Sequence, residues 1–229
     1  MKIKKNFLKN RLLHPEGWSL IGDFSLTGKF FRMFGNDRTL KGVVFNVPDI
    51  IKIREIKEKQ IISEIKSGKI FIYPTDTIYG LGCDANNVSS VNKIKLIKKR
   101  DSNNPLSIIA PSIGWIKKNL IIDTDLDKYL PGPYTIILKK KNLNFLSNVS
   151  NTDLLGIRIP NNDFTKIIQK TNVPFITTSV NLSGETPITK IPEINKEILE
   201  KVDYVIDVGE LNGRPSTLII NGKEIKRQI

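Results

Sequence analysis

The stretch KIFIYPTDTIYGLG, residues 69–82, decides the fold class because it joins an apolar run to a polar loop. The segment KIFIY predicts a buried strand, since it is short, apolar and rich in β-branched and aromatic residues. Isoleucines at close to helical spacing precede it over residues 50–66, and Gly68 is the expected end of that helix. A second amphipathic helix is predicted over residues 88–97. This helix–strand–helix order indicates an α/β domain.

The chain continues to alternate predicted helices and strands after this stretch. Helices are expected around 114–120, 163–170 and 193–200. Some neighbouring strands have no helix between them, which favours a mixed sheet over a purely parallel one. We therefore predict that residues 50–229 form an α/β domain with a mixed, twisted sheet flanked by helices. Its further strands are expected at 106–110, 134–138, 154–159, 173–180, 204–208 and 216–220.

Residues 1–49 differ in composition from the rest and are predicted to form a short N-terminal extension. They hold six of the ten phenylalanines and carry a net charge of +5. Short β-like runs broken by Gly22 and Gly28 predict a small hairpin over residues 18–34. The hairpin is expected to pack on the main domain. An extension that contacts substrate or RNA is the alternative, because the first fifteen residues hold five basic and no acidic residues.

The composition limits the chemistry that this chain can perform. Its 229 residues include one cysteine, Cys83, and one histidine, His14. The single cysteine excludes an internal disulfide and a cysteine-based zinc site, and the single histidine argues against Ser-His-Asp or Cys-His catalysis. Phosphoryl or nucleotidyl transfer fits this inventory, because it depends on positioning and charge neutralisation. No long apolar run predicts a transmembrane helix.

The net charge of +13 has two explanations that the sequence does not separate. It favours polyanionic partners such as nucleotides or RNA. A lysine-rich composition with solvated side chains explains it equally well.

Polar residues follow the strand 69–73 in the motif PTDTIYGLG (74–82). Thr75 and Thr77 point to the same side of an extended chain, and the two glycines allow a ligand to approach the backbone. An ordinary turn would explain the same residues, so the motif alone does not indicate a site.

A basic cluster, KKRDSNNPL (98–106), closes the helix predicted over residues 88–97. Basic residues at a helix C-terminus commonly interact with the helix dipole. Alternatively, they clamp a phosphate, with Arg100 binding two oxygens and Lys98 acting as a point charge. The sequence leaves both interpretations open.

Polar residues also occur within two predicted strands. Arg158 lies between two isoleucines, where a charge must face water or meet an anion such as a substrate carboxylate. In TTSVNLSG (177–184), Thr177, Ser179 and Asn181 fall on one face of an extended chain. Hydroxyl and amide groups at the carboxyl end of a strand commonly contact ligands in α/β folds.

Taken together, these clusters resemble the YrdC family of threonylcarbamoyl-AMP synthases, over roughly residues 52–228. The family's Lys-x-Arg and Ser-x-Asn signatures fall on Lys98/Arg100 and Ser179/Asn181. A paralogous branch of the family departs from that pairing of signatures. The presence of the pairing in this chain therefore favours the synthase activity. The matching motifs, in the family's order and with similar spacing, are PTDTIYGLG (74–82), KKR…NNPL (98–106), PGPYTIIL (131–138), LGIRIP (155–160), TTSVNLSG (177–184), PSTLII (215–220) and KRQ (226–228).

The resemblance implies a sheet curled around a deep basic cavity that binds ATP, with Mg²⁺, and L-threonine. No protein side chain is assigned to the metal. The chain departs from the family at Ile109, where many relatives carry a histidine. The residues implied to bind threonine are Thr77, Arg158, Thr177 and Ser216. Lys98 and Arg100 are implied to be catalytic, and the residues implied to bind ATP are Lys98, Arg100, Asn104, Ser179, Asn181 and Arg227.

The expected function is therefore the synthesis of threonylcarbamoyl-AMP and pyrophosphate from ATP, bicarbonate and L-threonine. The expected location is the cytoplasm, and the expected partner is a downstream transferase that modifies tRNA. Direct contact with tRNA or double-stranded RNA is a further expectation, whereas no membrane partner is expected. The alternatives are a non-catalytic module that binds double-stranded RNA or tRNA, and a paralogue with another substrate.

Overall fold

The computed structural model describes residues 19–25, 28–34, 40–41, 47–99 and 104–227, with side chains from residue 47 onward. The chain divides into two compact units, Met1–Val47 and Pro48–Ile229. In the described ranges, none of the helices combines the length and the apolar character that crossing a membrane requires.

The first unit contains a small antiparallel sheet in the order β1-β2-β3. Its strands are β1 (Ser19–Ser25), β2 (Gly28–Phe34) and β3 (Leu40–Lys41). The β1–β2 pair lies within residues 18–34, where the sequence predicts a hairpin, and its register places Ser25 opposite Gly28.

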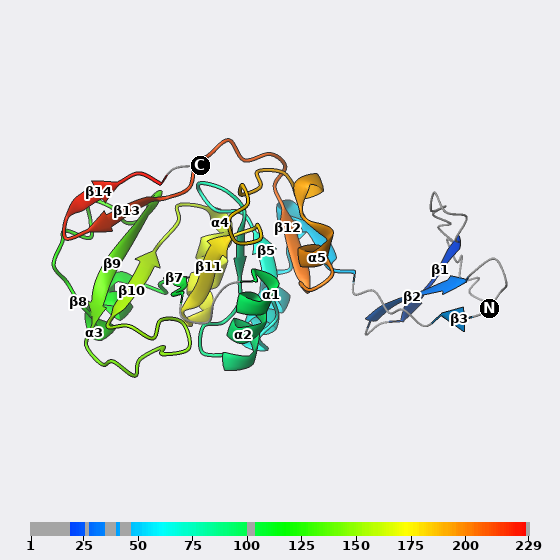
Figure 1. Cartoon of the computed structure of the whole chain (residues 1–229), viewed down its shortest axis with the longest axis horizontal. Coiled ribbons are helices and arrows are strands. Elements are labelled where there is room, and N and C mark those ends of the chain that lie inside the picture. Colours follow the sequence, from blue (N-terminus) through cyan, green and yellow to red (C-terminus); the bar gives the residue numbers. More distant parts are fainter. Residues whose placement is uncertain (1–18, 26–27, 35–39, 42–46, 100–103, 228–229) are drawn as a thin grey trace. The chain divides into compact units, whose positions relative to one another are not determined.

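A mixed sheet of eleven strands forms the framework of the second unit (Figure 1). The strand order is β14-β13-β9-β10-β7-β11-β6-β5-β12-β4, and β8 pairs with β9. Four pairs are parallel (β13·β9, β10·β7, β12·β5 and β12·β4), whereas the others are antiparallel. This mixture confirms the predicted α/β class. The strands are β4 (Asp49–Lys52), β5 (Phe71–Tyr73), β6 (Gly80–Gly82), β7 (Ser107–Ile109), β8 (Leu120–Ile121), β9 (Tyr134–Lys140), β10 (Leu154–Arg158), β11 (Phe175–Ser179), β12 (Tyr204–Asp207), β13 (Thr217–Ile220) and β14 (Lys223–Ile225).

Helices pack on both faces of this sheet. Successive residues of β5 and β12 enter two different buried clusters, as expected when neighbouring side chains point to opposite faces. Helices α1 (Glu58–Lys66) and α4 (Asp163–Thr171) contribute to the cluster that contains Phe71 and Tyr73. The larger cluster on the opposite face receives side chains from α2 (Val88–Ile97), α3 (Ile113–Asn119) and α5 (Lys196–Leu199). Two short 3₁₀ helices, η1 (Ile53–Glu55) and η2 (Ile191–Glu193), complete the unit.

The prediction of a helix over residues 50–66 is wrong for the first half of that range. Residues Asp49–Lys52 form β4, which pairs in parallel with β12, and α1 begins only at Glu58. Ile50 is 54% exposed, whereas Ile51 packs against a buried cluster, so the side chains here alternate as in a strand. The isoleucine spacing fits a helix over this segment, but the backbone pairs with the sheet edge.

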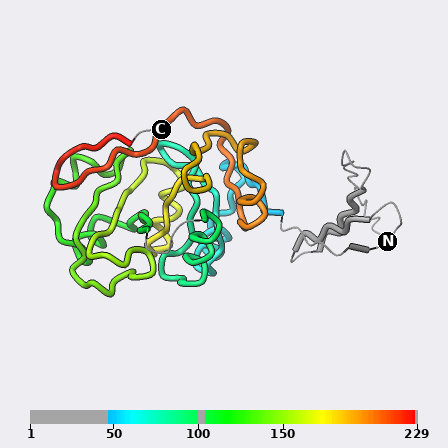
Figure 2. Tube along the Cα trace, viewed as in Figure 1, coloured from blue at the N-terminus to red at the C-terminus, as the bar shows by residue number. Residues whose placement is uncertain are grey.

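Side-chain alternation also determines which residues line a cavity in the second unit. In β10, Leu155 and Ile157 are buried in the larger cluster, whereas Gly156 and Arg158 face the cavity. Thr135 and Ile137 of β9 face it in the same way. Figure 2 shows the red trace of β13 beside the green trace of β9, which brings distant parts of the sequence to one wall.

Replacing Gly68 by alanine should destabilise the second unit by about 2–3 kcal/mol. Gly68 has a φ of +82°, and an added Cβ would collide with the side-chain amide of Asn87. That amide matters because Asn87 caps α2 by accepting a hydrogen bond from the backbone N–H of Ser90, at 3.0 Å. Chemical denaturation measures the loss.

The matched control is Gly209→Ala. Gly209 has a φ of +84°, but an added Cβ there has no heavy atom within 4 Å. This control therefore reports backbone strain alone, about 1 kcal/mol. Equal losses in the two variants would contradict the proposed collision with the α2 cap.

Candidate functional site

A cavity of about 760 Å³ opens in the second unit. Its walls come from β9, β10, β11 and β13 together with the loops after β5 and β11. Most of its polar groups are hydroxyls, which favours neutral hydrogen bonding over bulk charge. The hydroxyl-bearing residues that line it are Thr75, Thr77, Tyr79, Ser107, Thr135, Thr152, Thr177, Thr178, Ser179, Thr186 and Ser216.

The loop after β5 is held in one conformation by its own hydroxyls. Thr75 Oγ1 donates to the carbonyl of Ile78 at 2.7 Å and accepts from the backbone N–H of Thr77 at 3.1 Å. The two threonine hydroxyls lie 2.8 Å apart. Thr75 and Thr77 are each 4% exposed, so the loop presents an ordered pair of hydroxyls to the cavity.

Arg158 extends from β10 toward this loop and is 6% exposed. Its Nη2 donates to Asp76 Oδ1 at 2.6 Å and to Thr77 Oγ1 at 3.3 Å. Its Nε is buried without a hydrogen-bond partner. Burial lowers the pKa of the Arg158 guanidinium, while the neighbouring Asp76 raises it. An arginine remains protonated at neutral pH, so a buried cation with an unused donor faces the cavity.

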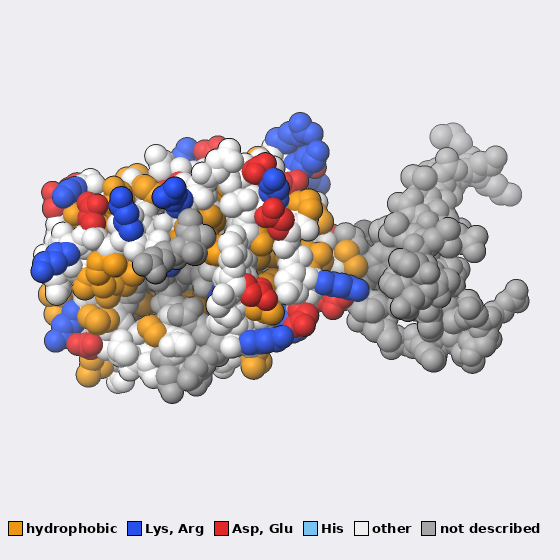
Figure 3. Space-filling view, turned by 45° about the horizontal axis from the view of Figure 1, so that its top comes forward, with side chains coloured by type: hydrophobic (Ala, Val, Ile, Leu, Met, Phe, Trp, Pro, Cys, Tyr) orange, Lys and Arg blue, Asp and Glu red, His pale blue; other side chains and the backbone are white. Residues whose placement is uncertain are grey.

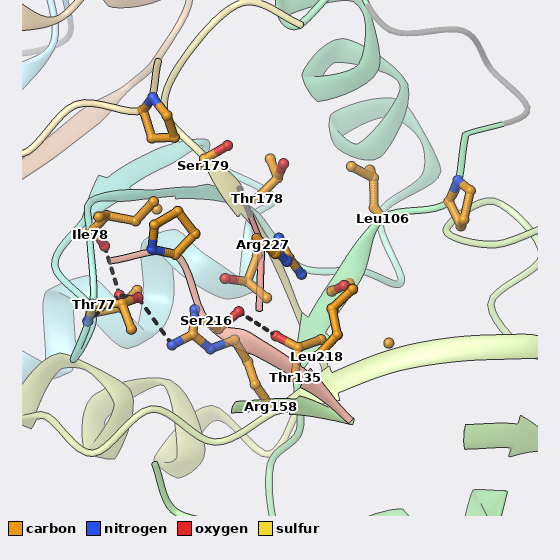
Figure 4. Close-up of a pocket in the computed structure, with 18 of the residues that line it drawn as sticks. Thr77, Ile78, Leu106, Thr135, Arg158, Thr178, Ser179, Ser216, Leu218 and Arg227 are labelled. Atoms are coloured by element: carbon orange, nitrogen blue, oxygen red, sulfur yellow. Dashed lines mark hydrogen bonds between the residues drawn. The ribbon is translucent and has the colours of Figure 1, made fainter. Parts of the chain in front are cut away.

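Ser216 and Thr177 also line the cavity. Figure 4 shows the Arg158 guanidinium hydrogen-bonded to Thr77, and the Ser216 hydroxyl directed toward Thr135. Ser216 is 5% exposed, and its Oγ lies 2.8 Å from Thr135 Oγ1. Thr177 of β11 is buried and also lines the cavity. The four residues predicted to bind threonine therefore line one cavity.

The segment 208–216 is tied to Tyr79. The Tyr79 hydroxyl accepts from the backbone N–H of Val208 at 3.1 Å and donates to the carbonyl of Gly209 at 2.7 Å. Burial raises the pKa of this phenol above its usual value, so it stays protonated and able to donate.

Gly213 fixes the far part of the same segment against Thr77. A Cβ at Gly213 would collide with the Thr77 carbonyl oxygen and lie 2.5 Å from the Thr77 carbonyl carbon. Only glycine allows two backbones to approach this closely. Because Ser216 follows three residues later, this contact helps to fix the spacing between Thr77 and Ser216.

The structure brings Lys98 to the loop after β11. Lys98 is 3% exposed, and its Nζ donates to the carbonyls of Ser179 at 2.7 Å and Asn181 at 2.9 Å. It also donates to Asn181 Oδ1 at 2.8 Å. Ser179 lines the cavity, whereas Lys98 and Asn181 are absent from its described lining.

Of the remaining residues predicted to bind ATP, only one is found in the described lining of the cavity. Arg100 lies outside the described residues, and Asn104 is exposed. Arg227, which follows β14, reaches the cavity and appears at its centre in Figure 4. Ile109, at the position of the family histidine, is fully buried in the cluster with Phe71 and does not line the cavity.

The charged residues of the described lining are Arg158, Arg227 and Glu185. Within the described residues, no group of three or more His, Cys, Asp or Glu side chains could hold a metal ion.

Charges on the surface are mixed rather than segregated. Figure 3 shows Lys and Arg side chains interspersed with Asp and Glu over the visible face of the second unit. Several exposed pairs lie within contact distance, such as Lys170 and Glu58 at 2.7 Å and Lys190 and Glu210 at 3.0 Å. On this face, the positive charge does not form one continuous basic strip.

Sequence reasoning did not identify four residues that shape this site, namely Asp76, Tyr79, Thr135 and Gly213. A signal for Asp76 existed, because an arginine within an apolar strand requires an anionic or polar partner. No comparable signal marks Gly213, because its importance depends on contact with Thr77, more than a hundred residues away.

Comparison with known proteins gives consistent results. The Sua5/YciO/YrdC family, described as "Telomere recombination", matches residues 63–229. A Methanocaldococcus jannaschii protein provisionally named threonylcarbamoyl-AMP synthase is 43% identical over 182 residues, covering 74% of this chain and 86% of that protein. The threonylcarbamoyl-AMP synthase of Pyrococcus abyssi is 28% identical over 184 residues, covering 77% of this chain.

Solved structures show the same likeness. The structure of P. abyssi Sua5 complexed with L-threonine superposes with a TM-score of 0.65 at 26% identity, covering 76% of this chain. This chain spans about half of the P. abyssi protein, with 54% of its length covered.

Proposed function

Because the chain belongs to the Sua5/YciO/YrdC family, we propose that it is a threonylcarbamoyl-AMP synthase acting on ATP, bicarbonate and L-threonine. The observation that carries the proposal is the buried Arg158 guanidinium beside the hydroxyls that line one end of the cavity. The cavity volume of about 760 Å³ suits small molecules, whose sites usually measure about 300–1,000 Å³.

The amino-acid end of the proposed site is formed by Arg158, Thr77, Thr177 and Ser216. A guanidinium with an unused donor suits a carboxylate, since charge-assisted hydrogen bonds are the stronger kind. The surrounding hydroxyls suit the amine and the side-chain hydroxyl of threonine, because each hydroxyl can donate or accept. Asp76 would hold Arg158 in place while the substrate binds.

The nucleotide end would lie toward Ser179 and Arg227, which line the cavity. Arg100 and Asn104 are the other residues expected to bind the triphosphate. Mg²⁺ would enter with ATP, held by phosphate oxygens and water, which suits its preference for oxygen ligands. When bound, the ion would neutralise part of the phosphate charge.

The proposed reaction uses no protein nucleophile. The threonine amine combines with bicarbonate to give a carbamate and water. A carbamate oxygen then attacks the α-phosphorus of ATP, and pyrophosphate leaves. Within this scheme the protein positions the reactants, stabilises the charge on the phosphates and shields the labile carbamate from water. The product would serve a transferase that modifies tRNA.

Incubation with ATP, Mg²⁺, bicarbonate and L-threonine should release pyrophosphate and form an adenylate with the mass of threonylcarbamoyl-AMP. Omitting threonine or bicarbonate should abolish both signals, because each supplies atoms of the product. L-Serine serves as the specificity control, since a paralogue with another substrate would use other amino acids equally well. Binding of RNA without any pyrophosphate release would instead support a non-catalytic module.

A further inference from the structure

Lys98 occupies an unusual place at the end of α2. The helix ends at Ile97, Lys98 keeps a helical backbone, and Lys99 adopts a left-handed φ of +49°. This reversal of chain direction leaves Lys98 buried and Lys99 exposed, where it pairs with Glu197 at 2.9 Å. The two neighbouring lysines therefore face different surroundings.

The ammonium group of Lys98 already has three oxygen acceptors, namely Ser179 O, Asn181 O and Asn181 Oδ1. A lysine ammonium has three N–H donors, so these contacts match its full donor capacity. A direct contact with phosphate would require giving up at least one of them.

The segment that Lys98 holds is tied together internally. Ser179 Oγ donates to Asn181 Oδ1 at 2.6 Å, and Asn181 Nδ2 donates to the carbonyl of Glu185 at 2.5 Å. The backbone N–H of Ser183 donates to the Lys98 carbonyl at 3.1 Å. Lys98 thus contacts the segment through both its side chain and its backbone.

This segment connects Lys98 to the cavity wall. Ser179 and residues 184–187 line the cavity, whereas Lys98 is absent from its described lining. The described contacts that link Lys98 to the cavity wall therefore run through the segment 179–187.

We propose that Lys98 is a positioning residue whose ammonium fixes the segment 179–187, so that this segment, rather than Lys98 itself, contacts the nucleotide. The proposal rests on the proposed function for the identity of the ligand. It assigns Lys98, Ser179 and Asn181 to one structural unit, in which the lysine supports the serine and asparagine.

Lys140 supplies a matched control. It is also buried, 2% exposed, and its Nζ donates to the carbonyls of Leu143, Phe145 and Ser150 at 2.9, 3.2 and 3.0 Å. None of these three partners lines the cavity as described. Lys140→Met thus removes an ammonium with a similar set of contacts, none of whose acceptors lines the cavity as described.

The test compares Lys98→Met and Lys140→Met by ATP titration and by amide hydrogen exchange without ligand. Lys98→Met should weaken ATP binding about 10- to 100-fold, because buried oxygens lose their donors and the segment shifts. It should also speed exchange across residues 179–187. Lys140→Met should lose thermal stability but change ATP affinity less than about 3-fold, since none of its three acceptors lines the cavity as described.

Double substitution separates positioning from direct contact. If Lys98 acts through the segment, Lys98→Met combined with Asn181→Ala should bind ATP about as weakly as the worse single variant. Additive losses, or unchanged exchange over residues 179–187 in Lys98→Met, would overturn the proposal. Lys98→Gln, which keeps a donor and should recover part of the affinity, replaces Lys98→Met if that variant does not fold.

Failure of the proposed function would look different. Wild-type protein would then show no ATP binding and no threonine-dependent pyrophosphate release. Faster exchange over residues 179–187 in Lys98→Met would still be observed, because it depends on the contacts within the protein alone.

Discussion

Replacing Arg158 by alanine should raise the KM for threonine by about 100-fold and leave the KM for ATP nearly unchanged. The guanidinium faces the proposed carboxylate position, and truncating one partner of a buried charge pair usually costs about 2–5 kcal/mol. ATP would bind at the other end of the cavity, toward Ser179, so its affinity depends little on this side chain. Steady-state kinetics with each substrate varied in turn measures the two effects.

A loss of stability must be separated from this loss of binding. Arg158→Ala leaves Asp76 without its 2.6 Å partner, and removing one partner of a buried ion pair costs about 3–5 kcal/mol of stability. Asp76→Asn combined with Arg158→Ala should recover most of that stability but none of the threonine affinity. Arg158→Lys keeps the charge but loses the two-donor fork, so it should restore only part of the affinity. A threonine KM that stays near wild type in Arg158→Ala would remove Arg158 from the site.

Replacing Gly213 by alanine should reduce threonine-dependent pyrophosphate release by at least about 100-fold, because small displacements of a positioned substrate cost about that much. The added Cβ would lie 2.5 and 2.6 Å from backbone carbon atoms of Thr77, which no side-chain rotation can relieve. Either Thr77 or the segment 208–216 must therefore move, and both carry hydroxyls of the proposed threonine position. The loss should appear in both kcat and the threonine KM.

Gly114→Ala is the control for Gly213→Ala. Gly114 lies in α3, and a Cβ there has only Ser112 Oγ within 4 Å, at 3.8 Å. Alanine is favoured over glycine in a helix by about 0.5–1 kcal/mol, so this variant should be slightly stabilised and fully active. Wild-type turnover in Gly213→Ala would show that the contact between segment 208–216 and Thr77 does not govern the site.

Much of the fold could be predicted because strand and helix signals in this chain are strong and local. The buried strands β5, β7, β9, β10, β11, β12 and β13 all lie within or over predicted apolar runs, and α2 matches its predicted bounds. The short strands β6, β8 and β14 escaped prediction because, unlike β5 and β7, they do not lie within an apolar run of strand length. The β4 segment was misassigned because three isoleucines at i, i+3 spacing fit a helix, and only its partner β12 decides otherwise.

The sequence predicted which residues belong to the site better than it predicted the contacts between them. Thr77, Arg158, Thr177, Ser179 and Ser216 all line the cavity. The first four stood out as polar in or beside an apolar strand, whereas Ser216 was expected only from the family resemblance. The surroundings of Lys98 were not foreseen, because sequence order does not show that its amine is enclosed by the segment after β11. The roles of Asp76 and Gly213 depend on long-range contacts in the same way.

The parallel pairing of β13 with β9 has a consequence for how the protein acquires its site. Thr217 lies opposite Tyr134, so the wall that carries Ser216, Leu218 and Thr135 joins segments more than eighty residues apart. Contacts between such distant segments form late, because loop-closure entropy must be overcome first. A partly folded chain can already contain helices and a local core while its substrates find no enclosed place to dock.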